Sequence, residues 1–131
     1  MWGVFAGDGR CHAIAEPFRS EGDGDRSWVA VGHWPGRRIH GQLHVRLGRD
    51  KRTGSAVLLR IDGRSFQLRG AARDAWAPDA RADEEIAAAM RTGIEMVVET
   101  RSIRGLAIRD HYRLRGAATA IDAAALACVS R

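Results

Sequence analysis

The chain contains 131 residues, of which 45% are hydrophobic and 28% are charged. These proportions are typical of an ordinary globular protein and exclude a disordered or fibrous one, and the length corresponds to a single domain, residues 1–131. No apolar run approaches the roughly 20 residues that a helix needs to span a bilayer, so no transmembrane segment is predicted.

The net charge of +5 is carried almost entirely by arginine and is unevenly placed. Basic residues dominate from Arg37 to Arg73, and acidic residues dominate from Asp74 to Glu99. This pattern predicts a basic face beside an acidic one, which is either a site for an anionic polymer or a solvated, self-complementary surface. The candidate residues for binding a polyanion are Arg37, Arg38, Arg46, Arg49, Lys51 and Arg52.

The two cysteines, Cys11 and Cys128, lie near opposite ends of the chain. Their separation excludes a CxxC motif, and no histidine or second cysteine near Cys128 completes a local pair of zinc ligands. A disulfide between them is predicted, with two buried free thiols in a cytosolic protein as the alternative. The disulfide would place the protein in an oxidising compartment, periplasmic or secreted.

The first predicted strand follows Met1 directly, without the charged and apolar regions of a signal peptide. The chain is therefore either leaderless or a mature fragment in which Met1 replaces an export signal. The predicted disulfide favours the fragment.

The N-terminal half has the alternating pattern of β-strands separated by glycine and proline. The expected strands are residues 2–6, 11–15, 28–34 and 39–47. Trp28 and Trp34 share one face of their strand, which we interpret as the core side. The acidic, glycine-rich segment 20–26 has no apolar periodicity and is therefore a predicted surface loop. It lacks the residue pattern of a calcium-binding EF-hand, so no calcium site is expected there.

The strongest local signal is a hairpin with Asp62-Gly63 between two alternating runs, 55–61 and 64–68. Asp-Gly at this place predicts a type I′ turn, in which both central residues have positive φ. A two-residue loop fixes the register, so the expected opposite pairs are Ile61 with Arg64, Leu59 with Phe66, and Val57 with Leu68.

The C-terminal half is predicted to contain two short helices and a second hairpin. Asp79 or a neighbour caps a helix running to about Arg91, with Gly93 as its candidate C′ residue. Strands are expected at 94–100 and 106–114. The expected inward residues are Ile94, Met96, Val98, Leu106, Ile108, Tyr112 and Leu114.

The last helix is predicted at residues 116–128, with Thr119 as a possible N-cap. Its apolar stripe contains Ile121, Ala125 and Cys128. Small residues after Cys11 in the second strand would let this helix dock closely against it.

The sequence carries no motif of a catalytic or cofactor site. It has neither a GxSxG nucleophile elbow nor a phosphate-binding loop, and adjacent residues such as Cys11 and His12 point to opposite faces of a strand. The five histidines are scattered, so no metal and no cofactor are predicted. A stacking, basic surface for single-stranded nucleic acid could form from arginines interleaved with His33, Trp34, His40 and His44. The known motifs for this function are absent, so nucleic acid is not the expected partner.

Several short motifs, taken in order, resemble the invasion-associated locus B family of Gram-negative bacteria. They are Trp2-Gly-Val-Phe, Cys11-x-Ala-Ile-Ala-Glu-Pro17, Leu59-Arg-Ile-Asp-Gly-Arg-Ser-Phe-Gln-Leu68, Ala75-Trp-Ala77, Ala87-Ala-Ala-Met-Arg-Thr-Gly93 and Tyr112-x-Leu-x-Gly-Ala-Ala-Thr-Ala-Ile121, with Cys128 at the end. The resemblance spans nearly the whole chain. It implies an exported, periplasmic or surface-associated domain with an immunoglobulin-like β-sandwich, supports the Cys11–Cys128 disulfide, and supplies no catalytic residues.

The sequence therefore predicts an antiparallel β-sandwich with two short helices that acts by binding a protein or an envelope component. A binder of anionic polymers is the first alternative. A hydrolase assembled from dispersed histidines and aspartates is the second.

Overall fold

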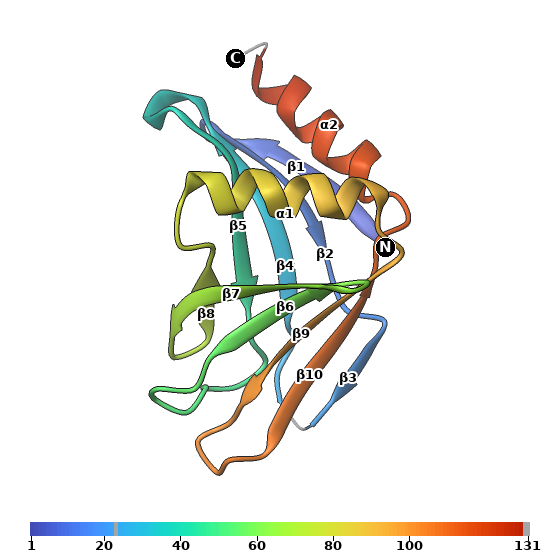
Figure 1. The fold of residues 1–131 in the computed structure, drawn as a ribbon. Coiled ribbons are helices and arrows are strands. Elements are labelled where there is room, and N and C mark those ends of the chain that lie inside the picture. Colours follow the sequence, from blue (N-terminus) through green and yellow to red (C-terminus); the bar gives the residue numbers. More distant parts are fainter. Residues whose placement is uncertain (23, 130–131) are drawn as a thin grey trace.

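The computed structural model of this chain describes residues 1–22 and 24–129. Its antiparallel strands form one ten-stranded sheet that curls into a half-barrel, with two helices against its inner side (Figure 1). The prediction of a mainly β fold with two helices is confirmed. The strands are β1 (Trp2–Gly7), β2 (Arg10–Ala15), β3 (Arg19–Glu21), β4 (Trp28–Trp34), β5 (Ile39–Arg46), β6 (Val57–Ile61), β7 (Arg64–Ala71), β8 (Asp74–Trp76), β9 (Glu95–Arg101) and β10 (Ala107–Arg113), and the helices are α1 (Ala80–Thr92) and α2 (Ala117–Val129).

The immunoglobulin-like sandwich is not confirmed, because the strands do not divide into two sheets packed face to face. Their order in the single sheet is β1-β2-β4-β5-β8-β7-β6-β9-β10-β3. The three-residue strand β8 pairs with β5 on one side and with β7 on the other, and so joins the two halves by hydrogen bonds. Strand alternation shows which side chains share one side of a strand, but it does not show which strands become neighbours.

The predicted hairpin of β6 and β7 forms with the expected register. Ile61 lies opposite Arg64, Leu59 opposite Phe66, and Val57 opposite Leu68. The predicted type I′ turn is wrong, because Asp62 has a φ of 52° while Gly63 has no positive φ. A type I′ turn occurs instead between β1 and β2, where both Asp8 (51°) and Gly9 (74°) have positive φ.

Helix α1 begins as predicted at the N-cap Asp79, whose carboxylate accepts a hydrogen bond of 2.8 Å from the Ala82 amide. Gly93 follows the last turn of α1, and its backbone is extended, with a φ of −78°, rather than left-handed. It is needed for space, because a Cβ atom there would lie 2.6 Å from a methyl group of Ile61.

Helix α2 packs against β1 and β2, where Ala13 and Ala15 leave room for it. It is joined to β2 by the predicted disulfide between Cys11 and Cys128, whose Cα atoms are 5.9 Å apart. The helix starts at Ala117, so Thr119 is not its N-cap. Its buried residues are Ala117, Ala120, Ile121, Ala124 and Cys128.

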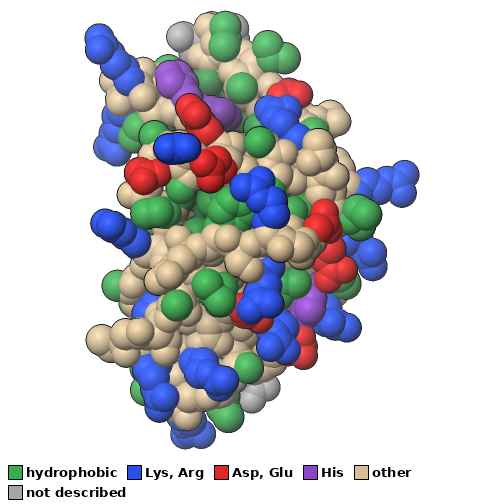
Figure 2. All heavy atoms as spheres, viewed as in Figure 1, with side chains coloured by type: hydrophobic (Ala, Val, Ile, Leu, Met, Phe, Trp, Pro, Cys, Tyr) green, Lys and Arg blue, Asp and Glu red, His purple; other side chains and the backbone are tan. Residues whose placement is uncertain are grey.

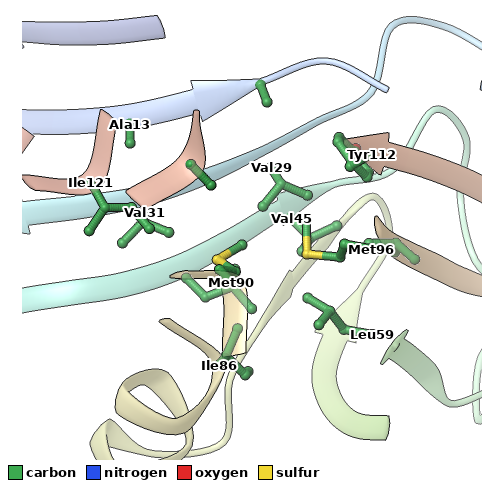
Figure 3. Packing of buried hydrophobic residues seen from close by; sticks show 14 of the residues in the cluster. Ala13, Val29, Val31, Val45, Leu59, Ile86, Met90, Met96, Tyr112 and Ile121 are labelled. Atoms are coloured by element: carbon green, nitrogen blue, oxygen red, sulfur yellow. The ribbon is translucent and has the colours of Figure 1, made fainter. Parts of the chain in front are cut away.

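The core lies between the inner side of the sheet and the two helices, as Figure 3 shows for Val31 and Val45 of the sheet and Ile86 and Met90 of α1. Of the inward residues predicted for the last two strands, all but two are buried, and the two exceptions lie at strand ends. Ile94 is 79% exposed and Leu106 is 59% exposed, because β9 and β10 each begin one residue later. The predicted loop 20–26 is shorter than expected, since Ser20 and Glu21 belong to β3; Asp23 lies outside the described residues.

Candidate binding face

The outer side of β1, β2, β4, β5 and β8 carries a set of partly exposed aromatic rings, which we call the aromatic face. Val29 and Val31 of β4 are buried on the inner side, so the alternate residues Trp28 and Trp34 point outward. The prediction that these two tryptophans belong to the core is therefore wrong, although they do share one side of the strand. The aromatic face consists of Phe5, His12, Trp28, Trp34, His44 and Trp76.

One end of the aromatic face is a group of three rings from three neighbouring strands. The His44 ring lies between Trp76, stacked at a centroid distance of 4.9 Å, and Trp28, edge-on at 4.8 Å. Asp74 fixes this arrangement, because its carboxylate bonds His44 Nε2 at 2.8 Å and accepts a hydrogen bond of 2.9 Å from Arg46. The rings are thus held in place by hydrogen bonds as well as by packing.

The other end of the aromatic face is built around Trp34. Its indole covers Gly32, where a Cβ atom would lie 2.6 Å from the ring, and it contacts His12 at a centroid distance of 5.3 Å. A surface pocket of about 430 Å³ beside Trp34 is lined by Arg10, Arg37 and Asp8, among others. This pocket places two arginines next to an aromatic ring that is partly open to solvent.

The electrostatics of the aromatic face follow from these contacts. Partial burial raises the pKa of Asp74, but hydrogen bonds from His44 and Arg46 outweigh it and hold that pKa below its ordinary value. Burial lowers the pKa of His12, and the nearby Arg10 lowers it further. At neutral pH the face therefore presents a neutral His12 near one end and an ionised Asp74 near the other.

The six basic residues predicted to bind a polyanion are not gathered at one place. Arg37 and Arg38 precede β5 and the other four lie at or beyond its end, so a strand of roughly 26 Å separates them. Lys51 is buried to 9% exposure and donates a hydrogen bond to the carbonyl of Arg52, and Arg46 is paired with Asp74. Figure 2 shows basic side chains scattered over the visible face with acidic ones between them.

The predicted basic and acidic segments pair with each other. Arg46 of the first segment contacts Asp74 of the second, and Arg60 contacts Glu99 at 2.8 Å. These contacts fit the self-complementary surface that was the alternative interpretation of the charge pattern.

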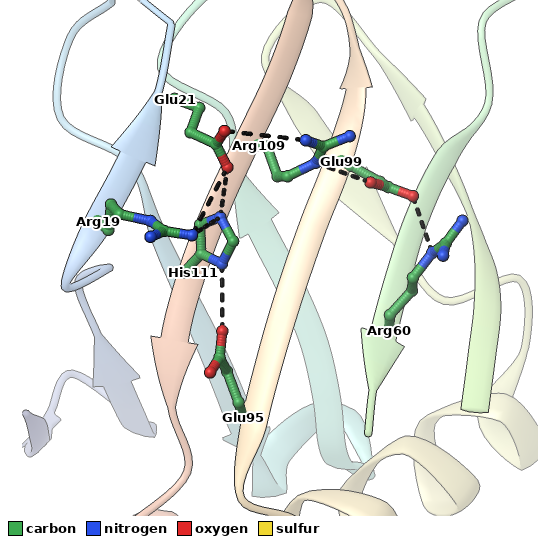
Figure 4. A network of polar contacts seen from close by, with 7 residues as sticks. All are labelled: Arg19, Glu21, Arg60, Glu95, Glu99, Arg109 and His111. Carbon is green, nitrogen blue, oxygen red and sulfur yellow. Dashed lines mark hydrogen bonds and ion pairs between the residues drawn. The ribbon is translucent and has the colours of Figure 1, made fainter. Parts of the chain in front are cut away.

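A second polar group covers the outer side of β3, β6, β9 and β10 (Figure 4). His111, whose side chain is 8% exposed, lies 2.6 Å from Glu21 and 3.2 Å from Glu95 through its two ring nitrogens. The network also contains Arg19, Arg60, Glu99 and Arg109. Since each member contacts at least one other member on a neighbouring strand, we interpret it as a structural network.

The described residues contain no group of three or more histidines, cysteines or carboxylates that could hold a metal ion. Among the described residues, the side chains hydrogen-bonded to the rings of His44 and His111 are all charged, and none belongs to a serine, threonine or cysteine. No helix among the described residues is long and apolar enough to cross a membrane.

Comparisons with protein-family models, with curated proteins and with solved structures found no match to this chain. The resemblance to the invasion-associated locus B family therefore stays a prediction. Of the aromatic face, the sequence indicated only a stacking surface that included Trp34 and His44, and it placed Trp28 and Trp34 in the core. Ala30 and Gly32 between the two tryptophans were a usable signal for the correct side. Large aromatic residues separated by small ones on one side of a strand indicate a surface where rings lie over the backbone.

Proposed function

We propose that this protein is a non-enzymatic binding module of the bacterial envelope or cell surface, periplasmic or secreted, of the invasion-associated locus B type. We further propose that it holds an anionic glycan across the aromatic face. The observation that carries this proposal is the position of Trp28, Trp34 and Trp76, which lie together on the outer side of the sheet instead of in the core.

An exported location is supported by the Cys11–Cys128 disulfide, since such bonds persist in oxidising compartments. Glycans are abundant polymers there, which makes them available partners. A binding role is supported by the histidines, because His44 contacts Asp74 and two indoles in an arrangement that holds rings in place without an adjacent nucleophile.

A glycan fits the chemistry of the aromatic face. The C–H faces of sugar rings pack on indoles, and Trp28 and Trp34 are six residues apart on β4, which separates them by roughly 20 Å and suits an extended chain of several sugars. Arg10 and Arg37 beside Trp34 can pair with carboxylate groups of the chain. An anionic glycan uses both the rings and the arginines.

Calorimetric titration with alginate, a soluble polyuronate, tests this function. We expect binding to the unchanged protein and at least tenfold weaker binding, about 1.4 kcal/mol, for Trp34→Ala. Phe18→Ala is the matched control, because Phe18 is 44% exposed and packs beside Arg113 on the other half of the sheet.

Two further ligands separate the alternatives. Dextran, which is neutral, should bind more weakly than alginate, because it cannot pair with Arg10 or Arg37. Binding of single-stranded poly(dT) in preference to alginate, with a steep dependence on salt, would instead indicate the nucleic-acid class of polyanion. Absence of alginate binding at low salt would overturn the proposal.

A further inference from the structure

The two ends of the sheet differ in how well they are protected against pairing with another strand. At one end, β3 has only three residues, Arg19, Ser20 and Glu21, all of them exposed and two of them charged. At the other end, β1 has six residues without a charge or a proline, and Val4 and Phe5 are 47% and 46% exposed. Short, charged edges prevent strand pairing, whereas a longer apolar edge favours it.

The hydrogen-bonding groups on the free side of β1 can be assigned from its hairpin with β2. Gly7 and Arg10 close a two-residue turn and form a hydrogen-bonded pair, so Gly3, Phe5 and Gly7 direct their backbone groups toward β2. The backbone groups of Trp2, Val4 and Ala6 consequently point to the free side. Within the described residues no other strand pairs with that side.

We propose that β1 pairs antiparallel with β1 of a second copy of this chain, related by a two-fold axis through Val4. Such an axis, perpendicular to the sheet, keeps the helices of both copies on the same side. It places Val4 opposite Val4 of the second copy, and Trp2 opposite Ala6. In both copies, the N–H and C=O groups of these residues point to the free side of β1, so they can form hydrogen bonds between the two strands.

The side chains at this edge are complementary in the same register. Phe5 of one copy lies opposite Gly3 of the other, on the outer side of the sheet. A Cβ atom at Gly3 would have no neighbour within 4 Å, and an open pocket of about 410 Å³ beside it is lined by Met1, Ile14 and Trp28, among others. The exposed Phe5 ring of one copy can therefore cover Gly3 of the other and fill this pocket, and two-fold symmetry repeats the contact.

This complementarity favours a second copy over an unrelated extended peptide as the occupant of the edge. Pairing of two β1 strands brings no like charges together, since β1 carries no charged residue. The dimer would join the sheets of both copies edge to edge and make their aromatic faces continuous, although the pairing does not depend on what those faces bind.

Sedimentation equilibrium of the intact, disulfide-bonded protein tests the dimer. We expect the mass of two chains for the unchanged protein, and a shift to one chain for Val4→Lys, which places like charges opposite each other. Ser20→Lys, on the opposite edge of the sheet, should leave the mass at two chains. A single-chain mass for the unchanged protein across the accessible concentrations, or a dimer that persists in Val4→Lys, would overturn the proposal.

The register has its own test that does not depend on weakening the dimer. With Val4→Cys, a short bis-methanethiosulfonate reagent should link two chains, because opposite residues in an antiparallel pair have Cα atoms roughly 5 Å apart. Ala6→Cys should link poorly, since the two copies of residue 6 would be about 13 Å apart. Equal linking at positions 4 and 6, or linking at Ser20→Cys instead, contradicts this register.

Discussion

Gly93 connects α1 to β9 at a point where the chain passes against Ile61 and Leu114. A Cβ atom at this position would lie 2.6 Å from Ile61 and 2.8 Å from Leu114, which are distances that packed side chains do not reach. The sequence context indicated a helix end at Gly93 but a different reason for the glycine. Its conformation is open to any residue, and only the packing of α1 against the sheet excludes a side chain.

Replacing Gly93 with alanine should destabilise the protein by about 1–3 kcal/mol, because the added methyl group overpacks the junction of α1 with β6. Urea unfolding followed by far-ultraviolet circular dichroism measures the change. Gly63→Ala is the control, since a Cβ atom there meets nothing within 4 Å. Equal stability of Gly93→Ala and the unchanged protein would contradict the steric explanation.

At the scale of elements, β3 is attached to β10 through side chains as well as backbone. Glu21 receives a hydrogen bond from His111, and this bond, supported by Arg109 and Arg19, lowers the pKa of the Glu21 carboxyl. Because the folded-state pKa lies below the ordinary value of 4.5, the ionised Glu21 contributes stability above that value. The contribution is lost as the pH falls through the folded-state pKa.

Glu21→Gln should therefore lower the free energy of unfolding at pH 6, and the difference from the unchanged protein should shrink as the pH falls well below 4.5. Urea unfolding at a series of pH values measures this difference. Glu84→Gln, an exposed residue of α1, serves as the control. A difference that stays constant across the series would show that the Glu21 charge contributes nothing to the attachment of β3.

The strand β4 shows why an element's sides cannot be assigned from aromatic content alone. Its valines and its tryptophans form two alternating sets, and either set could be buried. The valine side is buried because α2 covers β4 from that direction, which leaves the larger tryptophans outside over Ala30 and Gly32. The candidate site thus lies on the side that hydrophobicity would assign to the core.

At the scale of the whole molecule, the Cys11–Cys128 disulfide closes a loop across a sequence separation of 117 residues. Cross-linking so long a loop restricts the unfolded chain strongly, and loss of a native disulfide from a small domain typically costs about 2–5 kcal/mol. The bond also holds α2 against β2, where small residues allow close packing.

Reduction of the disulfide should therefore lower the free energy of unfolding by about 2–5 kcal/mol. Urea unfolding with and without dithiothreitol measures the effect, and the Cys11→Ala, Cys128→Ala double variant should match the reduced protein and no longer respond to the reductant. An unfolding midpoint that does not change on reduction would mean that the packing of α2 on the sheet is sufficient without the bond.

Local features of this protein were determined by its sequence alone. The strand alternation, the register of the β6–β7 hairpin, the cap of α1 and the mainly β class all depend on neighbouring residues, whose chemistry a sequence displays directly. The chain has two cysteines, which can pair in one way only, so the sequence also predicted the disulfide.

The tertiary structure alone decided the half-barrel, the position of the tryptophans and the unprotected edge at β1. Each depends on which strands become neighbours or on where a helix packs, and both are set by contacts between residues far apart in the chain. The bridging role of the short strand β8 turned an expected sandwich into one curled sheet, and the placement of α2 decided which side of β4 faces solvent.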